Sequence, residues 1–184
     1  ARQPLLLDLF GHLRRQRAAV TDEMTRLESL VRAIDDALEA RMNDRTLTDA
    51  ELRELFGPAF SDEYQAEAEQ RWGDTPQFRQ SSRRTAEYTR ADWLTIKAEQ
   101  QQIFETMVAR FTDGVGSGEA AAMDAVEAHR VHVDRWYYDC PREFHVNLGE
   151  LFAGDSRYTD GMGAEGLDGF GDWVRDAIRA NARR

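Results

Sequence analysis

The sequence predicts an all-α protein in which a long N-terminal coiled-coil helix precedes a helical domain, either a small bundle or a globin-like packing. Apolar residues in the first forty positions recur at alternating separations of three and four, and those after residue 90 follow a period of 3.6. No segment alternates apolar and polar residues between turn signals, as the strands of a sheet would. We therefore place the helix at residues 1–42 and the domain at residues 43–184.

The N-terminal helix carries a narrow apolar seam over nearly five heptads. Its a positions are Phe10, Arg17, Met24, Val31 and Leu38, and its d positions are Leu6, Leu13, Val20, Leu27 and Ile34. A seam of two positions in seven favours a partner helix, because a helix that covers its own core usually buries a wider face. We therefore expect a homodimer through residues 6–38, with a seam roughly 48 Å long. The alternative is a long helix packed on its own domain.

Two short helices and a polar segment are expected next. Thr48 and Glu51 form a capping box, which predicts a short helix that Gly57-Pro58 ends. Ser61 is expected to cap a second helix, whose apolar positions are Tyr64, Ala68 and Trp72. Residues 73–90 are polar, and we expect them to be partly mobile without a ligand.

Four stronger helices follow, each with one apolar face. They are predicted at residues 91–112, 119–137, 142–153 and 165–180. Their apolar residues recur with the period of an α-helix, so the four can bury one face each in a small bundle or a globin-like packing.

Charge and composition exclude several classes of protein. The net charge is -10 and the basic residues are scattered, so we expect no DNA contact from this chain by itself. No apolar run approaches the ~18 residues that cross a bilayer, and the N-terminus lacks the features of a signal peptide. The single cysteine, Cys140, fits a reducing compartment. We expect a cytoplasmic protein without a membrane partner.

Two motifs that suggest a cofactor or a metal do not hold. Gly161, Gly163 and Gly166 spell the dinucleotide fingerprint, but the polar residues before it are no buried strand. His129, His132 and His145, near Cys140 and Asp139, match neither zinc spacing nor the Glu-x-x-His repeats of di-iron bundles. We predict no cofactor and no metal, and His129 is then a hydrogen-bonded core histidine.

A thiol nucleophile is a further candidate for chemistry. Cys140 and His145 lie near an expected helix start, where a thiolate is stabilised. The sequence offers no third group to orient the histidine and no oxyanion site. We therefore predict a protein that is not an enzyme.

Several motifs closely resemble the TipA-type antibiotic-binding domain of MerR-type transcription activators. They are RWGDT at 71–75, TAEYTRADW at 85–93, HRVHVDRWYYDC at 129–140, EFHVNLGELF at 143–152 and GLDGFGDWVRDAIRAN at 166–181. The resemblance covers about residues 60–181. Residues 1–41 resemble the dimerisation helix that follows the winged-helix DNA-binding domain in such activators, and that DNA-binding domain is absent from this sequence.

The resemblance implies a globin-like helical antibiotic-binding domain. Its deep cleft would take large cyclic or peptide-like antibiotics such as thiopeptides, with the segment before the main helices closing over the ligand. Thiostrepton-type members capture the ligand through a cysteine, and Asn147 stands at that position here. We therefore expect reversible binding, with Cys140 in a structural or pocket-wall role.

The candidate ligand-binding residues are aromatic and polar side chains within these motifs. They are Trp72, Tyr88, Trp93, His129, Trp136, Tyr138, Asp139, His145 and Asn147, with Phe152 and Tyr158 in reserve. Aromatic rings would stack on heterocycles or on the face of a macrocycle, and the His, Asp and Asn side chains would donate or accept orienting hydrogen bonds. Each residue has the ordinary core as its alternative.

The function predicted from these observations is the ligand-sensing effector domain of a drug-responsive transcription activator. Binding would be signalled through the dimerisation helix to a winged-helix domain that contacts DNA and is not in this chain. The first alternative is a stand-alone drug-sequestering resistance protein. Two others remain open, namely a thiol-dependent enzyme that uses Cys140 and a purely structural dimer.

Overall fold

The computed structural model describes residues 3–57 and 62–184, with side chains from residue 13 onward. Every regular element in these residues is a helix, and the only β-type pairing among them is an isolated bridge between Thr46 and Thr89. The all-α prediction is therefore confirmed. The chain forms two compact units, Ala1–Arg45 and Thr46–Arg184.

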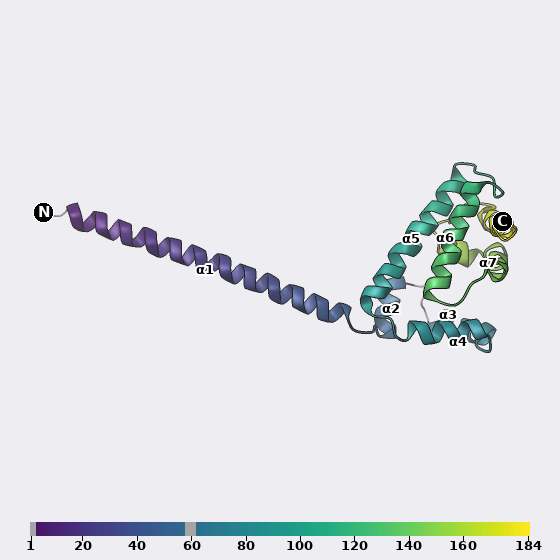
Figure 1. Cartoon of the computed structure of the whole chain (residues 1–184), viewed down its shortest axis with the longest axis horizontal. Helices are drawn as coiled ribbons and strands as arrows, with labels where there is room; N and C mark the ends of the chain where they lie inside the picture. Colours follow the sequence, from purple (N-terminus) through teal and green to yellow (C-terminus); the bar gives the residue numbers. More distant parts are fainter. Residues whose placement is uncertain (1–2, 58–61) are drawn as a thin grey trace. The chain divides into compact units, whose positions relative to one another are not determined.

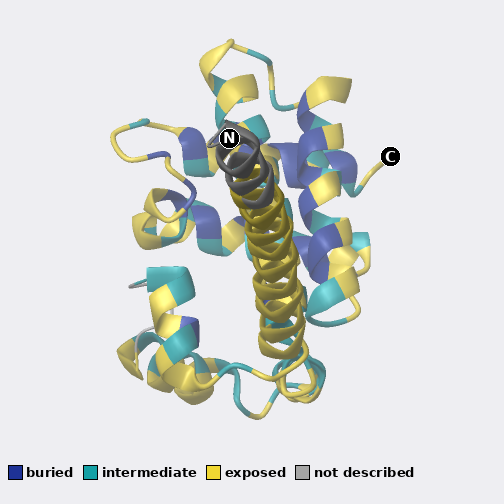
Figure 2. Ribbon diagram, turned by 90° about the vertical axis from the view of Figure 1, so that its left-hand side faces the viewer, coloured by how far each residue is buried: buried dark blue, intermediate teal, exposed yellow. Residues whose placement is uncertain are grey.

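The first unit is the helix α1, Gln3–Asn43, drawn in purple and blue in Figure 1. The predicted seam residues from Leu13 to Leu38 are all about half exposed or more, and Figure 2 shows the described part of this helix exposed along its length. The side chains of Leu6 and Phe10 lie outside the described residues. From Val20 to Leu38 the seam therefore presents an exposed apolar stripe that a second helix can cover.

The second unit begins with three short helices, α2 (Asp49–Phe56), α3 (Asp62–Trp72) and α4 (Pro76–Thr85). The predicted capping box of α2 is confirmed, because the Thr48 N–H donates to Glu51 Oε2 at 2.9 Å. Ser61, the expected cap of α3, lies outside the described residues.

Helix α4 lies within the polar segment 73–90, for which no helix was predicted. The hydroxyl of Thr75 accepts a hydrogen bond from the Phe78 N–H at 3.2 Å, and Pro76 occupies the first turn. A threonine cap followed by proline is a helix start signal, since proline lacks an N–H that would otherwise need a partner. The polar composition of the segment masked this signal.

Four longer helices enclose the core, namely α5 (Arg90–Thr112), α6 (Ala120–Trp136), α7 (Arg142–Gly154) and α9 (Phe170–Asn181). The most extensive pairings are α7 with α9, α5 with α6, and α6 with α9, and Figure 1 shows α5 and α6 side by side. The large apolar side chains that are almost completely buried in this core are Met107, Val126, Phe170, Val174 and Ile178.

Two details of the C-terminal region differ from the prediction. The last helix begins at Phe170 rather than at residue 165, and a short helix, α8 (Ser156–Asp160), precedes it. Gly166 and Gly169 have φ angles of 75° and 82°, a left-handed conformation that a right-handed helix excludes. The apolar periodicity extended the predicted helix backward through this turn.

Glycine lets α7 and α9 approach closely. A Cβ atom at Gly171 would lie 2.3 Å from the carbonyl oxygen of Phe152, and one at Gly149 would lie 3.3 Å from the Cα of Arg175. Both helices thus use the missing side chain where their backbones meet.

A second, smaller apolar cluster joins α2 to α5. Leu52, Trp93 and Ile96 are its buried members, and Leu47, Leu55, Phe56, Tyr88, Trp136 and Tyr137 pack around them. The ammonium group of Lys97 also donates to the carbonyl of Leu55 at the end of α2.

No helix in the described part of the chain is long and apolar enough to cross a membrane.

Candidate functional site

One cavity of the second unit is bordered mainly by rings and leucine side chains, and we call it the aromatic slot. It has a volume of 500 Å³, and helices α3, α4, α7 and α8 contribute to its walls. Its lining residues are Trp72, Thr75, Gln77, Phe78, Ser81, Tyr138, Phe144, Asn147, Leu148, Leu151 and Tyr158. A mostly apolar concave site with a few polar groups is the usual form of a small-molecule site.

The polar groups of the slot are few and uncharged. Asn147 offers an amide on α7, and Thr75, Gln77 and Ser81 offer hydroxyl and amide groups at the start of α4 and along it. Burial raises the pKa of Tyr138 well above its usual value, so its phenol stays protonated at neutral pH. The slot therefore suits a ligand with a flat ring system and a small number of hydrogen-bonding groups.

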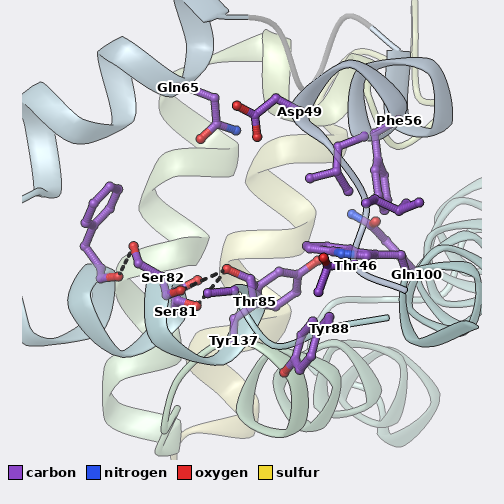
Figure 3. A pocket seen from close by; sticks show the side chains of 15 residues that line it. Thr46, Asp49, Phe56, Gln65, Ser81, Ser82, Thr85, Tyr88, Gln100 and Tyr137 are labelled. Atoms are coloured by element: carbon purple, nitrogen blue, oxygen red, sulfur yellow. Dashed lines mark hydrogen bonds between the residues drawn. The ribbon is translucent and has the colours of Figure 1, made fainter. Parts of the chain in front are cut away.

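A second cavity, which we call the polar chamber, lies between α2, α3, α4 and α5. It has a volume of 610 Å³, and its lining residues are Thr46, Leu47, Asp49, Leu52, Phe56, Gln65, Phe78, Ser81, Ser82, Thr85, Ala86, Tyr88, Trp93, Gln100 and Tyr137. In Figure 3, Gln65 and Asp49 lie next to each other on one side of this chamber, across from the hydroxyl groups of α4.

The floor of the chamber is the smaller apolar cluster. Trp93 is 4% exposed, and the edges of the Phe56 and Tyr88 rings meet it at centroid distances of 5.5 and 5.6 Å. Burial raises the pKa of Tyr137 to about 12. Among the described residues, Asp49 is the only charged side chain that lines the chamber, so the chamber disfavours an anion.

Helix α4 lines both cavities. Phe78 and Ser81 belong to the wall of the slot and to the wall of the chamber. No residue of α4 is buried, so the position of this shared wall depends on polar contacts at its edge.

Those contacts join α4 to the turn between α6 and α7, and we call them the α4 clasp. The Arg84 guanidinium donates to the Asp134 carbonyl at 2.8 Å and to Asp139 Oδ1 at 2.6 Å, and the Asp139 N–H donates to Gln80 Oε1 at 3.0 Å. Hydrogen bonds with Gln80 and Arg84 lower the pKa of Asp139. The clasp is exposed, so salt weakens it.

A similar set of ion pairs joins α3 to α8. Arg157 contacts both oxygens of Glu67 at 3.1 Å and Asp155 Oδ2 at 2.6 Å. Its guanidinium also lies 5.4 Å from the centre of the Tyr64 ring. Because α3 has no buried residue either, both helices on the outer side of the cavities are attached by polar contacts.

The structure places the predicted ligand residues in four environments. Trp72, Tyr138 and Asn147 line the slot, as does the reserve residue Tyr158, and Tyr88 and Trp93 line the chamber. Asp139 belongs to the clasp. The remaining four, Trp136, His129, His145 and the reserve residue Phe152, line neither cavity.

Trp136 supports the floor of the chamber from behind. Its indole N–H donates to Glu99 Oε2 at 2.7 Å, and its backbone carbonyl accepts a hydrogen bond from the Tyr88 hydroxyl. The rings of Tyr88 and Trp136 meet edge to face at 5.6 Å. Trp136 thus orients Tyr88 rather than facing the cavity itself.

His129 and His145 form a pair inside the core, between α6 and α7. His129 Nδ1 and His145 Nε2 lie 2.9 Å apart, and both residues are buried. Burial lowers the pKa of His145 to about 4 and that of His129 well below its ordinary 6.5. Phe152 packs edge to face against His129. The expectation that these histidines orient a ligand gives way to the core interpretation.

The structure provides no activated thiol at Cys140. The residue is fully buried, and burial raises its pKa to about 11, whereas a nucleophilic thiolate needs a lowered pKa and access. The ring of His145 is paired with His129 instead. Among the described residues, no group of three or more His, Cys, Asp or Glu side chains is arranged to hold a metal ion.

Several cavity residues were not predicted from the sequence, and α4 contributes the largest group of them. Phe78, Ser81, Ser82 and Thr85 are spaced at i, i+3, i+4 and i+7, which places them on one face of a helix. The Thr75-Pro76 start signal could have revealed this face. The contribution of Gln65 from α3 has no comparable local signal.

Comparison with known proteins gives matches along most of the chain. The model of the TipAS antibiotic-recognition domain matches residues 64–181. The HTH-type transcriptional activators TipA of Streptomyces coelicolor and Streptomyces lividans are 39% identical over 174 residues, covering 95% of this chain and 68% of each activator. The HTH-type transcriptional activator mta of Bacillus subtilis is 31% identical over 128 residues, covering 70% of this chain and 42% of its own length.

A solved structure shares both the sequence and the fold. It is TipAS in complex with nosiheptide, from a thiopeptide antibiotic multidrug resistance system of Streptomyces lividans. The two are 40% identical with a TM-score of 0.66, and the match covers 75% of this chain and 96% of that one. The resemblance noted in the motifs is confirmed, and this chain belongs to the TipAS antibiotic-recognition domain family.

Proposed function

We propose that this chain is the ligand-sensing effector part of a MerR-type transcription activator and that it binds bulky, thiopeptide-like antibiotics. The observation that carries the proposal is the aromatic slot, in which Trp72, Tyr138 and Asn147 meet in a chain of the TipAS family. Stacking on rings and a few hydrogen bonds are the interactions that recognise flat heteroaromatic groups.

Binding in the slot is proposed to be reversible. Asn147 lines the slot with an amide, which cannot act as the nucleophile of a Michael addition. The single cysteine of the sequence, Cys140, is buried and has a raised pKa. Neither side chain supports covalent capture, and a sensor that binds without turnover needs no other chemistry.

The signal is proposed to leave the domain through a homodimer of α1 at residues 6–38. The exposed apolar stripe of α1 supports this assembly. DNA would be contacted by a winged-helix domain that is not in this chain, as the kinship with HTH-type activators suggests. Activation then requires that the ligand bind two states of the dimer with different affinity. The site of action would be the cytoplasm.

A second candidate function is drug sequestration, in which the chain lowers the free antibiotic concentration by mass action. The similar TipAS structure comes from a multidrug resistance system, which favours keeping this alternative. A sequestering protein has no use for a dimer that changes with the ligand. Ligand-dependent change in the α1 dimer therefore separates the two functions.

The test of the proposed function is thermal unfolding of the chain with nosiheptide and other thiopeptides. A ligand that binds only the folded state, at ~100 times its Kd, adds about 2.7 kcal/mol to stability. We expect a selective rise in Tm and an unchanged protein mass after denaturation. A persistent mass adduct would overturn reversible binding, and the lack of any shift across the thiopeptides would overturn the function itself.

A further inference from the structure

The aromatic slot and the polar chamber meet along one face of α4. Phe78 and Ser81 line both cavities, so the two cavities are adjacent at these side chains. Each cavity by itself, at 500 and 610 Å³, has the size that holds one drug-sized molecule. A bulky antibiotic needs more room than either provides alone.

The two cavities differ in the chemistry of their walls. The slot is bordered by five aromatic rings and two leucines, with four uncharged polar side chains between them. The chamber has an apolar floor at Trp93 and a polar rim from three helices, which Gln65, Ser82 and Gln100 exemplify. In Figure 3 the rim groups of α3 and α4 approach the cavity from opposite sides.

We propose that the slot and the chamber are two halves of one bipartite site that binds a single ligand. The slot takes a flat aromatic part, and the chamber takes an uncharged or cationic part that carries hydroxyl or amide groups. This inference rests on the proposed function and adds the second half of the site to it.

The chamber is suited to that second part for two reasons. Its amide side chains, Gln65 and Gln100, can each donate and accept hydrogen bonds, which matches the groups of a peptide-like molecule. The hydroxyls of Ser82 and Thr85 donate to carbonyls of α4 and can still accept a hydrogen bond from a ligand.

In the part of the chain that the structure describes, Asp49 is the chamber's one charged lining residue, so a carboxylate or a phosphate on the ligand would meet a like charge. The floor is fixed by a packed aromatic cluster, in which Ile96 and Trp93 are buried, and this lowers the ordering cost of binding.

The first test uses NMR of the chain with methyl-labelled leucine, with nosiheptide as the probe. Leu47 and Leu52 report on the chamber, Leu148 and Leu151 report on the slot, and Leu94 is an exposed control that lines neither cavity. We expect contacts from nosiheptide protons to methyl groups of both cavities and none to Leu94. Contacts with slot leucines only would overturn the bipartite site and leave the proposed function standing. Contacts with neither would remove the proposed function.

The second test fills the chamber. Ser82→Trp adds an indole at a position that lines the chamber, whereas Arg83→Trp adds the same indole at the next position, which is exposed like Ser82 and lines neither cavity. We expect the Kd for nosiheptide to rise at least about tenfold in Ser82→Trp, because the indole displaces the ligand part from the chamber, an effect as large as the loss of one strong binding contact. In Arg83→Trp we expect the Kd to rise less than about twofold. Equal affinity of Ser82→Trp and wild type would overturn the proposal.

A further variant tests the chamber without filling it, and the unliganded Tm of each variant shows whether the substitution disturbs the fold. Gln65→Leu keeps the chamber open and removes one polar rim group. Unliganded Tm values equal to wild type show that each variant is folded. A several-fold weaker affinity in Gln65→Leu would support a polar ligand part in the chamber, and an unchanged or stronger affinity would contradict it.

Discussion

At the scale of single residues, Trp72 separates a binding role from a core role. It ends α3 and lines the aromatic slot, although α3 contains no buried residue. Trp136 has the same side chain and lies behind Tyr88, bonded to Glu99. The indole of Trp72 thus lines a cavity, whereas the indole of Trp136 supports Tyr88. The helices packed around each residue determine which role its side chain has.

Replacing Trp72 with alanine should weaken ligand binding without unfolding the domain. The ring offers a large apolar face to the slot, and loss of such a contact costs about 1.5–3 kcal/mol, or roughly a 10- to 150-fold higher Kd. Isothermal titration calorimetry with nosiheptide measures the change. Leu94→Ala, at an exposed position on α5, is the control. An unaltered Kd in Trp72→Ala would remove the slot as the binding site.

The buried histidines make stability depend on pH. The folded pKa of His145 is about 4, and those of His129 and His132 are lowered as well, in each case first by burial. Below the unfolded value near 6.5 the unfolded chain binds more protons than the folded chain. Stability is therefore kept above pH 6.5 and falls as the pH decreases toward 4, by about 1.4 kcal/mol per pH unit for each histidine that stays neutral.

Urea unfolding at pH 7, 6 and 5 measures this dependence. His145→Gln cannot titrate and can still hydrogen-bond to His129, so it should reduce the slope by about 1.4 kcal/mol per pH unit. The pKa values of Glu99 and Glu127 are lowered from 4.5, so the protonation of these carboxylates changes the stability only below about pH 4.5. This lies outside the measured range of pH 7 to 5. Wild-type stability that is flat from pH 7 to 5 would contradict the prediction.

At the scale of elements, α4 forms a wall of the binding region without burying any of its own residues. It lines both cavities. The α4 clasp of Gln80, Arg84 and Asp139 supplies contacts that fix it against the α6–α7 turn. Asp139 therefore affects the cavities through α4, although it was predicted to contact the ligand directly.

Asp139→Asn should loosen α4 and weaken ligand binding modestly. The substitution keeps the shape of the side chain and removes the charge that Arg84 contacts, so we expect a roughly two- to fivefold rise in Kd that disappears at high salt. Amide hydrogen exchange should become faster in α4 and stay unchanged in α9. Arg79→Ala, on the same helix outside the clasp, is the control. Equal exchange in the variant and the wild type would show that the clasp does not hold α4.

At the scale of the whole molecule, the chain combines a domain with its own core and a helix that exposes its seam. The domain buries apolar residues of α5, α6, α7 and α9 among themselves. Helix α1 leaves Val20, Met24 and Leu38 more than half exposed. An exposed apolar stripe of this length favours association.

A charge in the seam should therefore prevent dimerisation. Leu27→Asp places a carboxylate at a d position, where it would lose water in the dimer without gaining a partner, while Ser29→Asp adds the same charge at the outer f position. Sedimentation equilibrium should show a monomer for the first variant and a dimer for the second and the wild type. A dimeric Leu27→Asp chain would locate the interface elsewhere.

The sequence by itself determined the features that depend on residues close together in the chain. Helical periodicity, the Thr48–Glu51 capping box and the heptad seam are properties of residues within one or two turns of each other, so they can be seen in the chain. The family motifs likewise survive in the order of the letters, and they indicated the cleft and the ligand class. The capping signal of α4 was equally local, and only the polar composition concealed it.

Only the tertiary structure decided which side chains face a cavity. His129 lies on the apolar face of α6 and Tyr138 near its end, yet one packs against His145 in the core and the other lines the slot. The sharing of Phe78 between two cavities depends on where α3, α4 and α7 come together. Burial is a property of several helices at once, whereas periodicity reports one helix at a time, and for this reason the sequence predicted the helices better than the site between them.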